Sequence, residues 1–331
     1  MDLNNQRILN KIEACVDKLE LNLSGKIILT EVGSGLYKFT PLIALLGGAD
    51  KVFAWTNDSR YGTAEANISA CNYILSDSQK RKIDFYKGDF CPEHLEKADI
   101  VTNSGFIRPI DKRKLDLMKE KAVVPLMYEE WELRDSDIDI DYCSKKNIRV
   151  AGTWEDHPDI KVFSHVGPLA AKMAFEAGYE VFENEILVWS DDHFGDKIAS
   201  YFQKLGARKV TLTTKEDVLK AHVKKIDFIF ISDYSEKREY GKAGFFDFKK
   251  LSKVNPDLGI VHLFGKLNHK EISNYLPVVY PAFNGNSSVM TFTLAHVGIN
   301  PFINLQVAGF KVGELILSGK ESSLKQIIVG D

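Results

Sequence analysis

Short runs of apolar, β-branched residues alternate along the chain with longer amphipathic stretches from Lys26 onward. This rhythm is typical of βαβ units, in which helices connect parallel strands and cover the sheet. The expected strands form a first series of KIILTEV, KVFAWTN, IDFYKG, ADIVTNS, AVVPLMY and IRVAG, and a second of EILVWSD, KVTLTT, DFIFISD, GIVHLFG and PVVYPAF. Two successive series predict an α/β protein with two Rossmann-like, doubly wound parallel-sheet domains and an interdomain cleft.

The join between the two series lies in a stretch with few charges, which predicts a helix over 162–177. We therefore expect an N-terminal Rossmann-like domain over 1–165 and a dinucleotide-fold-like domain over 166–290. The remaining 291–331 is expected to form a C-terminal helical segment that returns across the domain boundary. A length of 331 residues suits two domains of ordinary size.

Charge and cysteine content exclude several classes of protein. The 43 basic residues are offset by 46 acidic ones, giving a net charge of -3 without the basic excess of a nucleic-acid binder. The four cysteines lie far apart without a CxxC pair, which argues against a zinc site or disulfide framework and suits a reducing cytoplasm. No apolar run approaches the roughly 18 residues that a membrane span needs. We expect a cytoplasmic protein without nucleic-acid or membrane partners.

The stretch IILTEVGSGLYKF carries a glycine pair between an expected strand and an amphipathic helix pattern. Such a turn indicates a phosphate- or nucleotide-binding loop, because glycines let backbone N–H groups approach an anion. Close packing against a neighbouring helix is the alternative reason for the two glycines. We favour a ligand and predict that it contacts Gly33, Ser34 and Gly35.

Polar residues follow several expected strands. Ligands of open α/β sheets bind outside the carboxyl ends of the strands, so we expect these residues to contact a small-molecule substrate. They are alternatively explained as polar turns and solvated loops, although Trp131 in YEEWELR fits a solvated loop less well. The stretch NGNSS indicates a turn and also a lip of the expected cleft. The candidate substrate-binding residues are Asn103, Ser104, Glu129, Glu130, Arg134, Asn284 and Asn286.

From Glu96 to Leu317 the order of elements resembles the D-isomer-specific 2-hydroxyacid dehydrogenase family. DIDYCSKKNIRVAGT resembles part of its first domain, and ILVWSDDHFGDKIASYFQKLGARKVTL lies where its dinucleotide fold begins. LAHVGINPFINLQVAGFKVGELI resembles its catalytic-histidine segment and closing helix. The resemblance implies an oxidoreductase with NAD or NADP as cofactor, and it implies that His296 is the acid–base residue.

The chain departs from this family at the dinucleotide loop, which reads SDDHFG. Only Gly195 of the glycine pattern is kept, while Asp191 and Asp192 place negative charge where the diphosphate of NAD would lie. After the next strand, TLTTKED offers threonines and Lys215 where an acid would hold the ribose of NAD. We expect that this loop does not bind NAD in the usual way.

The family's substrate-binding arginine and the acidic partner of its histidine also lack clear counterparts. Phe264 stands near the position of the arginine, and Lys266 or His269 are the nearby cations. A working histidine needs a second group to orient its ring, so we expect a carboxylate, or else Asn284 or Asn286, beside His296.

The first domain is also similar to the opening of class I S-adenosylmethionine-dependent methyltransferases. Glu31, Asp58 and Asp89 stand near the positions of acids that contact methionine, ribose and adenine in that family. This resemblance implies S-adenosylmethionine as an alternative cofactor, and it covers the first domain alone.

Three hypotheses therefore remain open. The first is an NAD(P)-dependent oxidoreductase that acts on a small acid or sugar-derived substrate, with His296 and Lys266 as candidate catalytic residues. The second is a methyltransferase, and the third is a non-redox, ligand-binding member of the dehydrogenase fold. A homodimer stays open as the oligomeric state.

Overall fold

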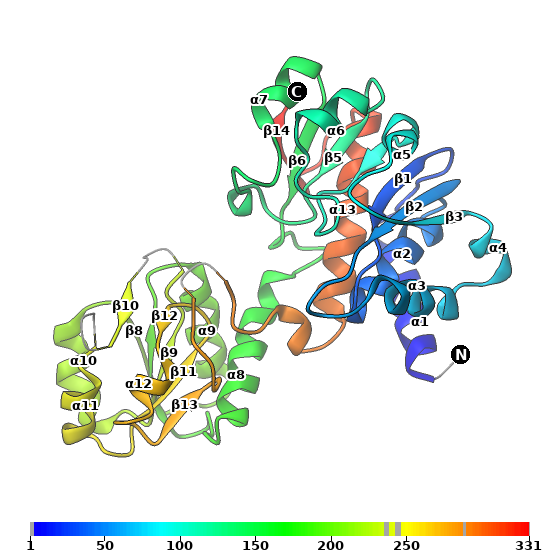
Figure 1. The fold of residues 1–331 in the computed structure, drawn as a ribbon. Helices are drawn as coiled ribbons and strands as arrows, with labels where there is room; N and C mark the ends of the chain where they lie inside the picture. Colours follow the sequence, from blue (N-terminus) through cyan, green and yellow to red (C-terminus); the bar gives the residue numbers. More distant parts are fainter. Residues whose placement is uncertain (1–2, 235–237, 242–245, 287–288, 331) are drawn as a thin grey trace. The chain divides into compact units, whose positions relative to one another are not determined.

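The computed structural model describes residues 3–234, 238–241, 246–286 and 289–330, and its chain is divided between two compact units (Figure 1). The first unit comprises Met1–Val162 and Ile299–Asp331, and the second comprises Phe163–Gly298. Each unit is built on a sheet of parallel strands covered by helices on both faces. The predicted fold class of two Rossmann-like α/β domains is confirmed.

The sheet of the first unit has the strand order β14-β6-β5-β4-β1-β2-β3. Six strands are parallel, and β14 pairs with β6 in the antiparallel direction. The order reverses between β1 and β4, which is where dinucleotide folds with the order 3-2-1-4-5-6 bind their ligand. The strands are β1 (Ile27–Glu31), β2 (Lys51–Thr56), β3 (Ile83–Lys87), β4 (Ile100–Val101), β5 (Val123–Pro125), β6 (Arg149–Thr153) and β14 (Lys325–Val329).

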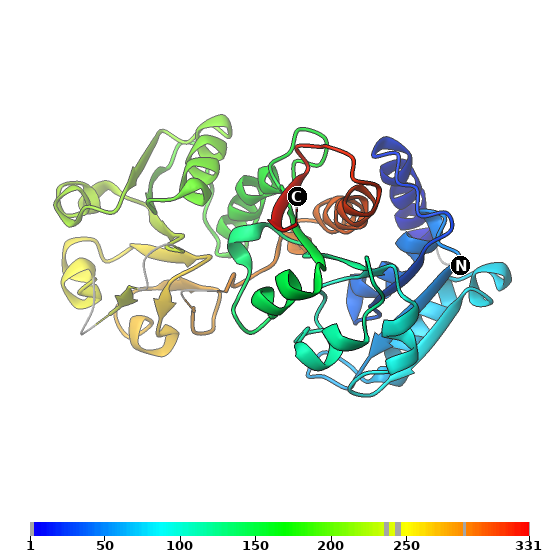
Figure 2. The same cartoon turned by 90° about the horizontal axis from the view of Figure 1, so that it is seen from above.

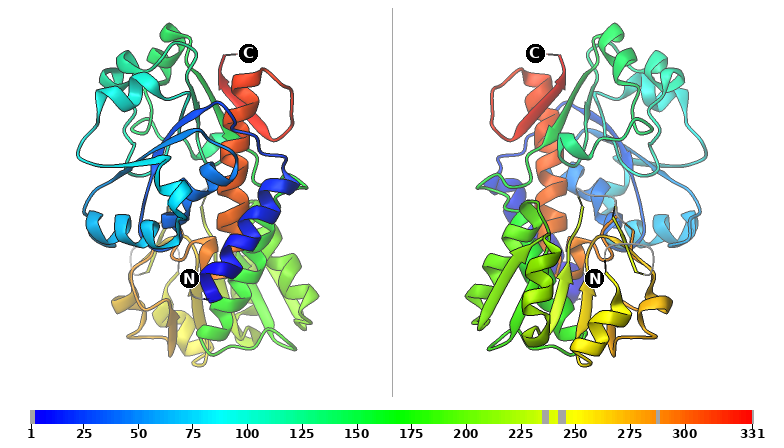
Figure 3. Two further views of the ribbon diagram at one scale, coloured as in Figure 1. Left: turned by 90° about the vertical axis from the view of Figure 1, so that its right-hand side faces the viewer. Right: turned by 90° about the vertical axis from the view of Figure 1, so that its left-hand side faces the viewer.

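Helices cover both faces of this sheet because the strands bury side chains on both faces. On one face, Leu29, Trp55 and Val101 pack against side chains of α5 (Pro92–Lys97), α6 (Lys112–Leu117) and α7 (Ile140–Lys146). The other face packs against α2 (Thr40–Leu46), α3 (Ala64–Ile74) and α13 (Asn300–Ser318). Helix α1 (Leu3–Lys18) lies beside α13 (Figures 2 and 3).

The second unit has five parallel strands in the order β13-β11-β9-β7-β8, so its order reverses between β7 and β9. The strands are β7 (Glu185–Trp189), β8 (Lys209–Thr213), β9 (Phe228–Ile231), β11 (Gly259–His262) and β13 (Val278–Tyr280). One face packs on α8 (Val166–Glu176) and α9 (His193–Lys204). The opposite face packs on α10 (Glu216–His222), α11 (Phe248–Val254) and α12 (His269–Ile272). A separate two-stranded sheet joins β10 (Glu239–Tyr240) to β12 (Lys266–Leu267).

Several elements differ in extent from the sequence expectation. The expected helix at 162–177 consists of a 3-10 turn, η3 (Phe163–His165), followed by α8. The long apolar stretch at 291–318 contains the turn η5 (Leu294–His296), and α13 starts only at Asn300, because Pro301 suits the first turn of a helix. Between the expected strands KVFAWTN and IDFYKG the chain forms two helices, α3 and α4 (Asp77–Lys80), because a capping box at Ser76 starts the second one. Within the described ranges, no helix has the length and apolar character needed to cross a bilayer.

Candidate functional site

At the carboxyl edge of the first sheet, Glu31 ends β1 beside the point where the strand order reverses. Its carboxylate is 7% exposed and accepts a hydrogen bond from the Phe106 backbone N–H at 3.2 Å. Burial raises the pKa of Glu31, and the hydrogen bonds from the Gly105 and Phe106 amides and the charge of Arg108 oppose this rise only in part. The Cβ of any residue replacing Gly105 would lie 3.1 Å from Glu31 Oε2, so the loop after β4 closes tightly over this carboxylate.

The turn Gly33-Ser34-Gly35 follows Glu31 directly and leads into η1 (Gly35–Phe39). Gly35 has φ +63°, and a Cβ built on it would meet no atom within 4 Å, so its outer side faces open space. The Ser34 hydroxyl donates to Asn67 Oδ1 at 2.9 Å, which fixes the turn against α3. Among described residues, none accepts a hydrogen bond from the backbone N–H groups of Ser34, Gly35 or Leu36. The turn can therefore donate several hydrogen bonds to an external group.

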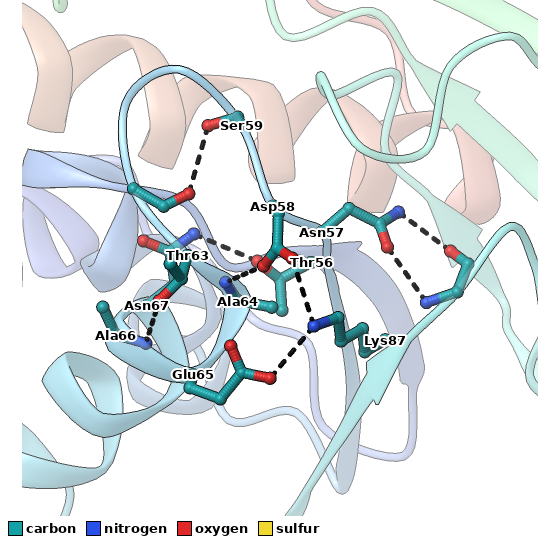
Figure 4. Close-up of polar contacts among 12 residues, drawn as sticks. Thr56, Asn57, Asp58, Ser59, Thr63, Ala64, Glu65, Ala66, Asn67 and Lys87 are labelled. Atoms are coloured by element: carbon teal, nitrogen blue, oxygen red, sulfur yellow. Dashed lines mark hydrogen bonds and ion pairs between the residues drawn. The ribbon is translucent and has the colours of Figure 1, made fainter.

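Asp58, which follows β2, is held by polar contacts to α3 and to the end of β3 (Figure 4). Asp58 accepts from the Ala64 N–H at 2.8 Å and pairs with Lys87 at 3.3 Å, while Lys87 also pairs with Glu65 at 3.0 Å. The amide hydrogen bond and the lysine hold the pKa of Asp58 below its usual range. The Asp58 side chain stays 60% exposed, which leaves carboxylate lone pairs available. Asp89 is 73% exposed, with Arg113 at 4.0 Å.

The ends of β4 and β5 carry a hydrogen-bonded group. Asn103 is 1% exposed and donates through Nδ2 to the Tyr128 hydroxyl, which donates in turn to Asp137 at 2.7 Å. Asp137 also pairs with Arg108 at 3.3 Å, and this is the one hydrogen bond of the Arg108 guanidinium within the described ranges. Asn103 Oδ1 is buried and has no hydrogen-bond partner among the described residues. The neighbouring Ser104 hydroxyl lies 2.6 Å from that of Thr102.

The loop after β5 brings three glutamates together. The 7% exposed Glu129 accepts from the Glu155 backbone N–H at 2.6 Å and from the Trp131 indole, and its own N–H donates to Glu132 Oε1 at 3.4 Å. Burial, with the Glu132 and Glu129 carboxylates close by, raises the pKa of Glu155 well above its usual value. Trp131 thus holds a carboxylate in place. In the part of the chain that the structure describes, no group of acids, histidines and cysteines is arranged to hold a metal ion.

Two other predicted residues of this loop lie differently. The Glu130 side chain is exposed, and its backbone N–H donates to Gln326 on β14 at 3.0 Å. Arg134 lines a hollow of about 480 Å³ together with Asp111, Asp135 and neighbouring residues. The first unit therefore brings Glu31, Ser34, Asn103, Ser104 and Glu129 to one edge of its sheet, because all of them follow the carboxyl ends of its parallel strands.

In the second unit, the loop after β7 folds onto the start of α9. Asp192 is the N-cap residue, and its Oδ1 accepts from the backbone N–H groups of Phe194 at 2.9 Å and Gly195 at 3.3 Å. The Ser190 hydroxyl donates to the same oxygen at 3.0 Å. A Cβ on Gly195 would lie 2.5 Å from the Cβ of Ser190, so this glycine permits close packing of α9 against β7.

The remaining predicted residues of the second unit lie in separate places. Lys266 is 61% exposed and pairs with Glu239 at 3.2 Å. Asn284 accepts a hydrogen bond from the His269 backbone N–H at 3.0 Å, so it fixes a turn. Asn286 forms an isolated bridge with Val289, and the two serines of NGNSS, Ser287 and Ser288, lie outside the described residues. Within the described ranges, no hydrogen bond or ion pair joins Lys266 to His296.

His296 lies in η5 with its Nε2 2.9 Å from Glu176 Oε2, and the two side chains are 28% and 31% exposed. Its ring stacks on Phe292 with the centroids 4.2 Å apart. The Tyr280 hydroxyl donates to the same glutamate at 2.6 Å, and Lys172 Nζ donates to the His296 carbonyl at 2.6 Å. His296 Nδ1 makes no hydrogen bond to the described residues. A carboxylate therefore orients this imidazole while its other nitrogen stays available.

Partial burial favours the neutral form of Glu176, but the hydrogen bonds from Tyr280 and His296 outweigh it and lower the pKa of the carboxyl. Burial, together with the hydrogen bond to Glu176, raises the pKa of Tyr280 to about 12. Glu176 at neutral pH is thus an anion, which is the state that orients a donor ring nitrogen.

Sequence reasoning missed Glu176, Arg108 and Glu155. Glu176 lies 120 residues before His296 and ends a helix, so no local pattern connects the two. Arg108 follows a polar turn after an expected strand, and its place at that strand end was a usable signal. Glu155 comes shortly after the expected strand IRVAG, so its place at a strand end was a signal of the same kind.

No protein-family model matches the sequence, and no curated protein matches it significantly. Among solved structures, the chain is similar to the A chain of dipicolinate synthase from Bacillus subtilis, with 14% identity, a TM-score of 0.54 and coverage of 91% of this chain and 100% of that chain. It is also similar to the pyruvate reductase of Chlamydomonas reinhardtii, with 8% identity, a TM-score of 0.53 and coverage of 91% and 99%. These likenesses confirm the resemblance to the D-isomer-specific 2-hydroxyacid dehydrogenases for the fold.

Proposed function

We propose that the protein is an oxidoreductase of the dehydrogenase fold and that its nicotinamide dinucleotide, NAD or NADP, binds to the first unit. The observation that carries this proposal is the turn Gly33-Ser34-Gly35, which follows β1 where the strand order reverses and leaves the backbone N–H groups of Ser34 and Gly35 without an acceptor among the described residues. Dinucleotide folds with this strand order bind a pyrophosphate at the corresponding turn. Asp58, after β2, stands where such folds place an acid on the ribose hydroxyls.

The carboxyl edge of the first sheet also offers a place for a small acid. Arg108 is 28% exposed and held by Asp137, and its planar fork has donors left for a carboxylate. Asn103 is linked to Arg108 through Tyr128 and Asp137, and its side-chain carbonyl oxygen has no hydrogen-bond partner among the described residues. We assign Arg108 the carboxylate-binding role for which the segment around Phe264 has no arginine.

The cofactor, when bound, accepts or supplies hydride at its nicotinamide ring. Within the second unit, His296 is the candidate acid–base residue, because Glu176 holds its Nε2 and leaves Nδ1 available for proton exchange. The Glu176 anion stabilises the imidazolium that forms when His296 takes the proton. Lys266 is exposed and paired with Glu239, so it has no part in this assignment.

Binding of NAD, NADP and S-adenosylmethionine to the full chain, measured by calorimetry and thermal shift, tests the cofactor. We expect NAD or NADP to bind and Gly35→Ala to weaken that binding roughly 10-fold or more, because the new methyl group projects into the open side of the turn. Gly25→Ala is the matched control, because Gly25 has φ +74° and is equally open, but it precedes β1 and so lies at the opposite end of that strand from the turn. Binding of S-adenosylmethionine alone would favour the methyltransferase, and binding of none of the three the non-redox alternative.

His296→Asn tests the chemistry separately. General acid–base catalysis typically contributes 10²–10⁴-fold, so we expect the rate of substrate-dependent cofactor reduction to fall roughly 100-fold or more. Cofactor binding should stay near the wild-type value. An unchanged rate would show that His296 serves the packing of η5 against Phe292.

A further inference from the structure

The loop of the second unit keeps the spacing of a dinucleotide fingerprint but not its residues. Ser190 to Gly195 matches G-x-G-x-x-G position by position, with Ser190 at the first glycine and Asp192 at the second. The third glycine, which such folds need for close helix–strand packing, is retained as Gly195 and allows α9 to pack closely against Ser190. The second glycine, which lets the backbone approach the pyrophosphate, is the one replaced by an acid.

The Asp192 carboxylate takes the hydrogen bonds that a phosphate would receive. Its Oδ1 lies 2.9 Å and 3.3 Å from the first free amides of α9, which are the donors that bind pyrophosphate in a dinucleotide fold. Asp191 adds a second negative charge and pairs with Arg238 at 3.5 Å. Asp233, which is 0% exposed after β9, pairs with the same arginine at 3.5 Å. Arg238 is thus already held by two carboxylates of the chain.

We infer that the second unit has become a dinucleotide fold closed by its own side chain, in which the Asp192 carboxylate stands in the place of the pyrophosphate and excludes NAD. The inference concerns the second unit alone and is independent of where the first unit binds a cofactor. It predicts that removing one side chain reopens an anion site on α9.

The test follows the backbone amides of Phe194 and Gly195 by NMR while NAD or inorganic pyrophosphate is added to the full chain. We expect these two amides to stay unshifted in the wild type and to shift in Asp192→Gly, with at least about a 10-fold gain in apparent affinity at this loop. Asp192→Ala serves as the second variant if the glycine variant folds poorly. In Asp192→Asn the two amides should stay unshifted, because the side-chain amide oxygen of asparagine accepts the same hydrogen bonds and keeps the loop closed.

Asp247→Gly is the matched control, because Asp247 is also an aspartate N-cap in the second unit and accepts from Lys250 N–H at 3.1 Å. It should lose its cap without gaining any response to NAD at α9. The inference would be overturned if NAD or pyrophosphate shifted the NMR signals of the Phe194 and Gly195 amides in the wild-type protein. It would also be overturned if neither Asp192→Gly nor Asp192→Ala gained affinity at this loop. The effect of Gly35→Ala on cofactor binding reports on the first unit and is read separately.

Discussion

Glu155 and His262 are buried ionisable side chains, and each makes stability depend on pH. Glu155 is 6% exposed and lies against other carboxylates, so its folded-state pKa is raised above its unfolded value. A carboxyl with a raised folded-state pKa contributes full stability below its unfolded pKa and loses it as pH rises through the folded pKa. Replacing Glu155 by a side chain that cannot ionise should therefore stabilise the first unit near neutral pH.

We expect Glu155→Gln to raise the free energy of unfolding at pH 7.5 by about 1 kcal/mol or more, since each pKa unit corresponds to 1.36 kcal/mol. The amide keeps the shape of the side chain and can donate to Glu132. Urea unfolding at pH 7.5 and pH 4 measures the change, and the gain should shrink at pH 4, where glutamates are largely protonated in both states. A gain of equal size at both pH values would contradict the electrostatic cause.

His262 gives the stability of the second unit the opposite dependence on pH. It is 0% exposed at the end of β11, and burial lowers its pKa from 6.5 to about 4. The unfolded chain then binds more protons than the folded one between these values, so stability falls as pH drops from 6.5 toward 4. The loss amounts to roughly 3 kcal/mol at 1.36 kcal/mol per unit.

His262→Leu should flatten this part of the stability profile, because leucine cannot bind a proton. The variant has its own packing defect, so the informative quantity is the slope of unfolding free energy against pH between pH 4 and 6.5, compared with the wild type. All other titrating groups are shared and cancel in the comparison. Parallel slopes would show that His262 is accessible to protons in the folded state.

The candidate residues that lie together at the carboxyl edge of the first sheet, such as Ser34, Asn103 and Glu129, are those that come shortly after an apolar strand. Parallel strands bring their carboxyl ends to one edge, so this placement needs only the strand positions. Contacts between residues that are far apart in the sequence could not be predicted from it. Glu176 meets His296 only because α8 and η5 pack together, and no periodicity encodes that contact.

Among the elements, α9 shows how one glycine fixes a helix on its sheet. A methyl group on Gly195 would lie 2.5 Å from Ser190 Cβ and 2.9 Å from Leu212 Cδ1. Overpacking of this kind typically costs 1–3 kcal/mol. We expect Gly195→Ala to lower the unfolding free energy by about that amount in chemical denaturation.

Gly298→Ala is the control for this substitution in the same unit. A Cβ on Gly298 would meet no atom within 4 Å, and no positive φ is recorded for it. The free energy of unfolding of Gly298→Ala should stay within about 0.5 kcal/mol of the wild-type value, as is usual for surface substitutions that disturb no packing, cap or strained backbone. Equal effects of both substitutions would place the cause in backbone entropy and not in the α9–β7 contact.

The elements that the sequence predicted well are those with strong apolar runs, such as FIFI in β9 and EILVW in β7. Strand β14 was not expected, because KQIIV follows a helix at the chain end and is partly exposed as an edge strand. The short sheet of β10 and β12 has two residues per strand, which is too little for any period to register. Helix ends depended on caps, as at Ser76.

Over the whole molecule, strand order separates the two units more clearly than strand content. The first unit has the order 3-2-1-4-5-6-7 in its own numbering, in which the seventh strand is the antiparallel β14, and the second has 2-1-3-4-5. The alternation of strands and helices predicted two doubly wound sheets, but it contains no information on which strand pairs with which. The order that the first unit adopts is the one associated with dinucleotides, which agrees with its open turn and with the closed loop of the second unit.

The chain also leaves the first unit once and re-enters it once, so the second unit is a single continuous insertion. It has an apolar core on each face of its sheet, formed from its own residues. In the first unit, Asn304 Nδ2 donates to the Ile160 carbonyl at 2.8 Å, so the points where the chain departs and returns lie close together. A short flexible link from Val162 to Ile299 can therefore span the gap.

We expect a polypeptide of residues 163–298 to fold alone, with cooperative two-state unfolding in urea and a slope in the range of about 1–3 kcal/mol/M. The complementary chain, 1–162 joined to 299–331 by a short Gly/Ser link, should fold as well, because α13 packs on β5 and β6 and completes that sheet's cover. Circular dichroism and dispersed amide NMR spectra measure both outcomes. If the insertion instead gives a broad, non-cooperative transition, its cores depend on the rest of the chain, and the division into two self-sufficient units is wrong.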